Sequence, residues 1–111
     1  MASALTRTQL AELRRRLEEE RTRIVRVLST SDAIHSTEED RGPEIEEVAQ
    51  RAAERDQAVG VLERERALLA EVDRALAKID RGEYGQSERT GAPIPYARLA
   101  AVPWAREDVD E

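Results

Sequence analysis

Few residues of this chain have the type and spacing that enzymatic chemistry needs. The only histidine, His35, lies in a polar stretch with no serine or cysteine nucleophile motif near it. The chain has no cysteine, which excludes disulfides, thiolate chemistry and cysteine-ligated metals. Its many glutamates follow helical patterns, and neither a glycine-rich phosphate loop nor a histidine-based metal spacing is present. The sequence therefore predicts a protein that is not an enzyme and has no cofactor.

The composition is typical of a charged helical protein with little material for a large core. Charged residues make up 38% of the 111 residues, and phenylalanine is absent. The net charge of −6 argues against nucleic-acid phosphates as the main partner, because glutamates are interleaved with most of the arginines. No apolar run approaches the ~20 residues of a membrane span. We therefore expect a cytoplasmic protein that binds neither membranes nor specific DNA sequences directly.

Start signals and an apolar stripe predict a first helix over about residues 6–29. Thr6 suits the N-cap position, and Gln9 three residues later completes a capping box. The run Ser29-Thr30-Ser31-Asp32 offers competing side-chain hydrogen bonds to the backbone, so we expect the helix to end there. A polar loop would follow over residues 30–43. The apolar residues at helical spacing are Leu10, Leu13, Leu17, Ile24, Val27 and Leu28.

A second and longer helix is predicted over about residues 44–81. Pro43 suits its first turn, and Gly82 is well placed as its C-terminal cap. Arg55 and Arg66 interrupt its apolar stripe, so an unbroken heptad repeat is not present. A helix of roughly 38 residues spans about 57 Å and is not stable alone in water, so its stripe must be covered. Pairing with the first helix predicts an antiparallel two-helix coiled-coil hairpin over residues 1–81.

The remaining residues, 82–111, predict a small irregular lobe that packs on the second helix. Pro93 and Pro95 exclude a helix around them, and a lobe of about 30 residues cannot be stable by burial alone. All three large aromatic residues of the chain lie here or at its start. The residues that we expect to pack the lobe are Tyr84, Tyr96, Leu99 and Trp104.

The stretch from Ile79 to Gly91 resembles the junction between helix and zinc finger in the DksA/TraR family of bacterial transcription factors. Ile94, the pair Arg98-Leu99 and Pro103 extend this resemblance, which runs without a gap from about Glu44 to the last residue. The four zinc cysteines of the family fall on Ser87, Thr90, Asp108 and Glu111. These residue types do not form a tetrahedral structural zinc site. The resemblance therefore implies a mostly α-helical fold with a zinc-finger-like lobe that lacks metal, in which Trp104, Tyr96 and the prolines replace the ion or Trp104 is an interface residue.

The same resemblance implies a function. Members of the family reach RNA polymerase through its secondary channel, with an Asp-x-x-Asp-x-Ala signature at the tip of the hairpin. Glu44, Glu47 and Ala49 occupy the matching positions, where the two acids also fit ordinary helix-start acidity. Arg64, on the second helix in the family register, is a candidate contact to the rim of the polymerase, and its alternative interpretation is a solvated helix charge.

Some family members hold the alarmone guanosine tetraphosphate with basic residues. The corresponding positions here are Glu71 and Val102, neither of which is cationic, so alarmone binding is not expected. The leading hypothesis is a transcription regulator that binds RNA polymerase and modulates initiation. The alternative is a non-catalytic coiled-coil protein that self-associates or binds a helical partner, with tip activity lost.

Overall fold

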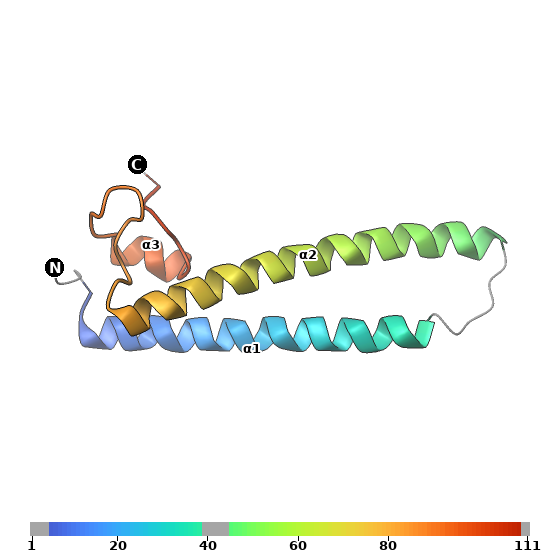
Figure 1. The fold of residues 1–111 in the computed structure, drawn as a ribbon, viewed down its shortest axis with the longest axis horizontal. Coiled ribbons are helices and arrows are strands. Elements are labelled where there is room, and N and C mark those ends of the chain that lie inside the picture. The colour runs from blue at the N-terminus through green and yellow to red at the C-terminus, as the bar shows by residue number, and fades with distance from the viewer. Residues whose placement is uncertain (1–4, 39–44, 110–111) are drawn as a thin grey trace. The chain divides into compact units, whose positions relative to one another are not determined.

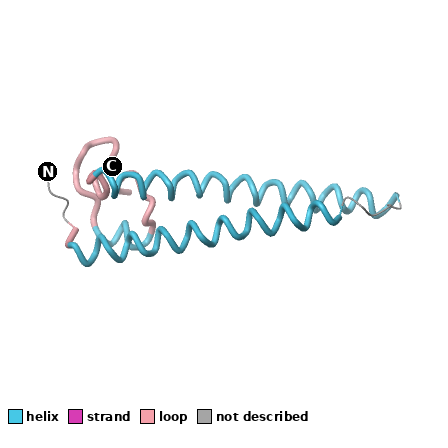
Figure 2. Tube along the Cα trace, turned by 60° about the horizontal axis from the view of Figure 1, so that its bottom comes forward, coloured by secondary structure: helices cyan, strands magenta, loops and turns pink. Residues whose placement is uncertain are grey.

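The computed structural model of this protein describes residues 5–38 and 45–109, and its ordered elements are three helices in this part of the chain (Figure 1). They are α1 (Arg7–Glu38), α2 (Ile45–Arg81) and the short α3 (Tyr96–Ala101). An isolated antiparallel bridge joins Gln86 to Pro93 in the loops after α2, which Figure 2 shows in pink. The predicted mostly α-helical class, a helical hairpin with an irregular C-terminal lobe, is confirmed. None of the described helices is both long enough and apolar enough to cross a membrane.

Both predicted caps are present. The Thr6 amide donates to Gln9 Oε1 and the Gln9 amide donates to Thr6 Oγ1, each over 3.0 Å, so the capping box at the start of α1 is reciprocal. At the end of α2, Gly82 has a φ of 75°. Its amide donates to the Ile79 carbonyl at 3.1 Å, and the Glu83 amide donates to Lys78 at 2.8 Å. These two bonds form a Schellman motif, which requires a left-handed residue where glycine costs least.

The predicted end of the first helix near residue 29 is wrong, because α1 continues to Glu38. Serine and threonine can hydrogen-bond to the carbonyl one turn earlier without leaving the helix. Thr22 does so in α1, where its hydroxyl donates to the Glu18 carbonyl at 3.0 Å. A short serine and threonine run is therefore a weaker stop signal than the Gly42-Pro43 pair further on, which lies outside the described residues.

The chain packs as two compact units, and both long helices contribute to each of them. The first unit combines α1 up to Thr22 with the chain from Ala70 onward, and the second runs from Arg23 to Leu69. The predicted boundary between a hairpin (1–81) and a lobe (82–111) does not coincide with this division. The first unit instead contains the lobe together with the N-terminal part of α1 and the C-terminal part of α2. These segments carry most of the buried apolar residues.

The core of the first unit is formed by α1, α2 and the lobe together. Arg21 pairs with Asp73 at 2.7 Å, and Arg16 Nη1 donates to the Ala100 carbonyl of α3 at 2.6 Å. These contacts join α1 to the other two helices. The buried apolar residues of this unit are Leu13, Leu17, Val72, Ala75, Tyr84, Ile94 and Leu99.

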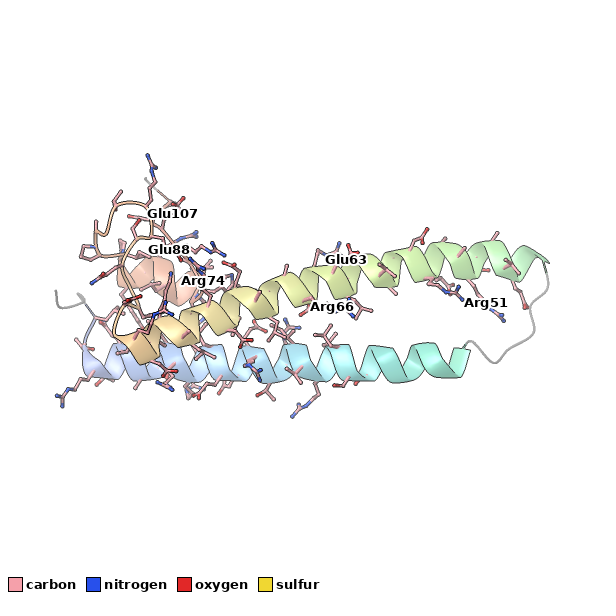
Figure 3. The ribbon with its side chains drawn as sticks, viewed as in Figure 1. Arg51, Glu63, Arg66, Arg74, Glu88 and Glu107 are labelled. Carbon is pink, nitrogen blue, oxygen red and sulfur yellow. The ribbon has the colours of Figure 1, made fainter. Side chains whose placement is uncertain are left out.

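The second unit pairs a segment of α1 with a segment of α2 and buries less. Ile24 and Leu62 are its buried apolar residues among those described. The guanidinium of Arg23 makes two contacts with the carboxylate of Glu65, at 3.1 and 3.4 Å, and so links the two helices. Arg66, which was predicted to interrupt the apolar seam, is exposed (Figure 3).

Candidate functional site

Two of the three predicted tip residues are described by the structure, and they lie near the start of α2. Glu44 is outside the described residues, whereas Glu47 and Ala49 are exposed. Since α2 begins at Ile45, Glu47 lies in its first turn, where the positive end of the helix dipole stabilises a carboxylate. Glu47 Oε2 is 3.4 Å from Arg51 Nη2, one turn further along. This contact is long and exposed, so the Glu47 carboxylate remains available to a stronger cation.

Arg64, the predicted polymerase contact, is exposed on the same compact unit. Its side chain folds back over Gly60, because a Cβ at Gly60 would meet Arg64 Nη1 at 3.6 Å. The guanidinium therefore lies along the outside of α2 instead of filling the interior. This position is open to a partner.

The second candidate site is the turn that carries the first two cysteine positions of the family. Ser87 is buried, and its hydroxyl oxygen accepts the amides of Arg89 and Thr90, each at 3.2 Å. The Gly91 amide donates to the Ser87 carbonyl at 2.9 Å, and the Ser87 amide donates to Ala92 at 2.8 Å. Gly91 has a φ of 75°, a value that side-chain-bearing residues rarely adopt. Protein hydrogen bonds close this turn.

The turn does not fit a metal ion. The Ser87 oxygen, at the first cysteine position, is already the acceptor of two amides, and a neutral hydroxyl is a poor zinc ligand. Asp108 is half-buried in the C-terminal segment, and Glu111 lies outside the described residues. In the described part of the chain, no group of three histidine, cysteine, aspartate or glutamate side chains could hold a metal ion.

The packing residues of the lobe differ in burial. Tyr84 and Leu99 are buried, and Trp104 is half-buried. Tyr96 is the most exposed of the four, because its side chain is 37% exposed at the start of α3. Tyr96 follows Pro95 directly as the first residue of the helix, whereas Leu99 three residues on faces the core.

Tyr84 is a buried hydrogen-bond donor inside the lobe. Its hydroxyl donates a 2.7 Å hydrogen bond to the Pro103 carbonyl. Burial raises the pKa of the Tyr84 phenol well above its ordinary value, so the hydroxyl stays protonated and remains a donor. The tyrosine thus closes the lobe through a neutral hydrogen bond.

A group of charged residues that the sequence analysis missed joins the lobe to α2, and we call it the ionic cluster. Glu88 in the loop contacts Arg74 on α2 (Figure 3). It also contacts Lys78, one turn further along the same helix. The hydrogen bond from Arg74 and then that from Lys78 lower the pKa of the Glu88 carboxyl to about 2. The full cluster consists of Glu71, Arg74, Lys78, Glu88 and Arg106.

One signal for the ionic cluster was present in the sequence. Glu71, Arg74 and Lys78 follow each other at three- and four-residue steps, so they share one face of α2. Their partners Glu88 and Arg106 are distant in sequence, and only the fold brings them there. The helical spacing along α2 alone therefore does not identify these two partners.

This architecture defines a class of protein: a helical hairpin with an exposed glutamate, Glu47, in the first turn of α2, and a small lobe that contains the turn at Ser87. No family model matches the chain. A stretch of 55 residues is 54% identical to General stress protein 16O of Bacillus subtilis, covering 50% of this chain and 32% of that protein. A stretch of 48 residues is 44% identical to the RNA polymerase-binding transcription factor DksA of Caulobacter vibrioides, covering 43% of this chain and 34% of that protein. The matches therefore span about a third of the length of these curated relatives.

Solved structures extend the similarity to nearly the whole chain. Transcription factor DksA2 from Pseudomonas aeruginosa has a TM-score of 0.84 and 29% sequence identity, covering 94% of this chain and 80% of that chain. The RNA polymerase binding protein and transcriptional regulator Dks from Chlamydia trachomatis has a TM-score of 0.57 and 27% identity, covering 96% and 85%. The resemblance to the DksA/TraR family is confirmed, in a chain that has no cysteine.

Proposed function

We propose that this protein is a non-catalytic transcription regulator that binds RNA polymerase. Support comes from its similarity in sequence to DksA of Caulobacter vibrioides and in fold to DksA2 of Pseudomonas aeruginosa. The observation that carries the proposal is the exposed start of α2, where Glu47 and Ala49 match the family's tip signature in charge and size.

The finer proposal concerns how the protein would act. The hairpin enters the secondary channel of the polymerase, and Glu44, Glu47 and Ala49 act at its tip to modulate initiation. Carboxylates are suited to a site built around magnesium, because that ion prefers oxygen ligands. The small side chain of Ala49 lets the helix approach a neighbouring surface closely. Arg64 supplies an additional contact to the polymerase from the exposed side of α2.

The regulator would act without the alarmone. Glu71 is the residue at one position where family members that hold guanosine tetraphosphate have a basic side chain. Its carboxylate is in contact with Arg106, so a negative charge is fixed where an anionic ligand would need a positive one. In transcription assays we expect guanosine tetraphosphate to leave the effect of this protein unchanged.

The experiment combines binding and transcription. Core RNA polymerase is captured with the wild-type protein, with the Glu44→Ala/Glu47→Ala variant and with Glu54→Ala, and initiation is measured for each. Glu54 is an exposed glutamate on the same helix and serves as the matched control. Retained binding with loss of the transcriptional effect, in the double variant alone, supports the tip mechanism. Failure of the wild-type protein to bind the polymerase contradicts the proposal.

A second candidate function rests on exposed valines in the second compact unit. A protein that self-associates or binds a helical partner needs exposed apolar side chains, and α1 and α2 carry four exposed valines. Light scattering over a range of protein concentrations separates the candidates, since self-association predicts a mass that rises with concentration. The exposed valines are Val25, Val48, Val59 and Val61.

A further inference from the structure

We propose that the ionic cluster defined above, with Glu88 at its centre, is a clasp that holds the lobe closed on α2. Ionic strength, and neither metal nor thiol chemistry, then controls the opening of the lobe. The members of the clasp come from three segments. Glu71, Arg74 and Lys78 lie on α2, Glu88 lies in the loop and Arg106 lies in the C-terminal segment, residues 102–109. The inference concerns the first compact unit alone and does not depend on polymerase binding.

The geometry places the Glu88 carboxylate between cations from two directions. Arg74 Nε donates to Glu88 Oε2 at 2.9 Å, and Arg74 Nη2 donates to Oε1. Lys78 Nζ donates to Oε2, and Arg106 Nη1 lies 4.0 Å from Oε1. A carboxylate that accepts an arginine through both oxygens is fixed in orientation as well as in distance. Glu88 is therefore held firmly on the face of α2.

Arg106 connects the C-terminal segment to the same face. Its Nε donates to Glu71 Oε1 at 2.7 Å, and its Nη2 donates to Glu71 Oε2. The backbone adds another link, because the Glu88 amide donates to the Arg106 carbonyl at 2.8 Å. The loop and the C-terminal segment are thus joined to each other and to α2. In the family pattern, zinc cysteines at positions 87, 90, 108 and 111 would join the same two segments, so the clasp occupies the structural role of the ion.

Burial makes Lys78 the member that depends most on Glu88. The Lys78 side chain is only 11% exposed. An ammonium group in that environment is strongly destabilising when its partner is removed. Three cations and two carboxylates leave the cluster with one net positive charge, and neutralising Glu88 would leave two. Loss of Glu88 therefore combines an uncompensated buried charge with repulsion among Arg74, Lys78 and Arg106.

The first test compares Glu88→Gln with Glu83→Gln by amide hydrogen exchange. Glu83 is a suitable control, because its pair with Arg81 lies in the same region but both side chains are more than half exposed. Exposed pairs of this kind contribute little. In Glu88→Gln we expect amides of residues 85–94 and 102–109 to exchange about tenfold faster, whereas Glu83→Gln leaves them within about twofold of wild type. Equal exchange in the two variants overturns the clasp.

Salt and chelator provide the second test on the wild-type protein. Raising sodium chloride from about 0.05 to about 1 M should accelerate exchange of the same amides by several-fold, because screening weakens partly exposed ion pairs. In Glu88→Gln the acceleration by salt should largely disappear. A metal chelator should change neither protein. Salt acceleration of equal size in wild type and Glu88→Gln would contradict the proposal.

A third variant keeps the proposal testable when Glu88→Gln folds poorly. Lys78→Met/Glu88→Gln removes the buried ammonium together with its carboxylate and preserves the volume of the lysine stem. We expect exchange in the double variant to be closer to wild type than in Glu88→Gln, and the helical circular dichroism to recover if the single variant loses it. A double variant that is no better protected than Glu88→Gln shows that Glu88 does not act through Lys78, and the clasp is overturned.

Discussion

The hydroxyl of Tyr84 and the carbonyl of Pro103 are joined by a 2.7 Å hydrogen bond between residues that lie 19 positions apart in the chain. Tyr84 follows the cap of α2, and Pro103 follows α3, so this bond links the beginning of the lobe to its last segment. Both residues are buried. Water cannot replace a hydrogen bond in that position at low cost.

Tyr84→Phe should therefore destabilise the protein while leaving its packing almost unchanged. The Pro103 carbonyl would lose its partner, and we expect a loss of about 1–2 kcal/mol in the free energy of unfolding. Urea denaturation followed by circular dichroism measures this value. Tyr96→Phe is the control, because Tyr96 is exposed and its loss should stay within about 0.5 kcal/mol. Equal effects in the two variants would contradict a special role for Tyr84.

Local signals in the sequence predicted the helix caps well. Thr6 with Gln9, and Gly82 after α2, are short-range patterns whose partners lie within five residues, so tertiary packing has little influence on them. The end of α1 was predicted wrongly, since Ser29 and Thr30 are compatible with helix as well as with a cap. The helix propensity of such a run does not decide whether the helix continues or ends there.

The ionic cluster could not be predicted for a different reason. Glu88 lies seven positions after the end of α2 and Arg106 lies 18 positions further on, so their meeting on the face of α2 depends on the complete fold of the lobe. The exposure of Tyr96 also depends on tertiary structure, because an aromatic residue beside Pro95 fits a core as well as a surface. The sequence signal from the lobe was its family resemblance, which located the turn at Ser87 but not the charges that surround it.

Acid should weaken the lobe through Glu88. Arg74 and Lys78 hold the pKa of Glu88 at about 2, below its ordinary value of 4.5, and Arg106 lowers that of Glu71. A lowered pKa in the folded state means that the stabilisation is fully present above the unfolded value and is lost as the pH falls through the folded value. The pKa of the Arg74 and Arg106 guanidinium groups is raised by their carboxylate partners, so these two arginines keep their charge throughout this range.

The measurement is the difference in unfolding free energy between wild type and Glu88→Gln as a function of pH. This difference should be constant above about pH 5 and should decrease steadily between about pH 5 and about pH 2. The glutamine cannot titrate, so the difference between the two proteins cancels the contribution of every group that does not interact with Glu88. A difference that stays constant down to about pH 2 would show that the ion pairs of Glu88 contribute no stability.

Substitution by alanine should change the stability in opposite directions at two glycines, Gly60 inside α2 and Gly82 at its C-terminal cap. Gly82 has a φ of 75° and no atom within 4 Å of an added Cβ, so Gly82→Ala suffers backbone strain alone and should cost about 1 kcal/mol. Gly60 lies inside the helix, and its added Cβ would meet Arg64 Nη1 at an ordinary 3.6 Å. Gly60→Ala should therefore stabilise the protein by about 0.5–1 kcal/mol. Thermal unfolding of both variants tests the pair, and a stabilising Gly82→Ala would contradict the Schellman cap.

The turn at Ser87 should depend on its hydroxyl and not on metal. Ser87→Ala removes the acceptor of two amides in a part-buried turn, which should cost about 1 kcal/mol. Ser29→Ala, at an exposed serine of α1, is the matched control and should have little effect. Calorimetry of the wild-type protein with and without a chelator should give the same transition. A chelator-dependent transition would mean that a bound metal supports the lobe.

Arg64 and Arg66 offer the sharpest separation of a specific polymerase contact from general charge attraction. They lie two positions apart on α2, which places their side chains roughly 200° apart around the helix. At most one of the two side chains can then face a given surface of a partner. If Arg64 contacts the polymerase, Arg64→Ala should weaken binding by about threefold to tenfold, whereas Arg66→Ala should leave it almost unchanged. Titration of labelled core polymerase with each variant measures the two dissociation constants. Equal losses would show that the arginines act only through the net charge of α2, and a loss in Arg66→Ala alone would assign the contact to the opposite side of the helix.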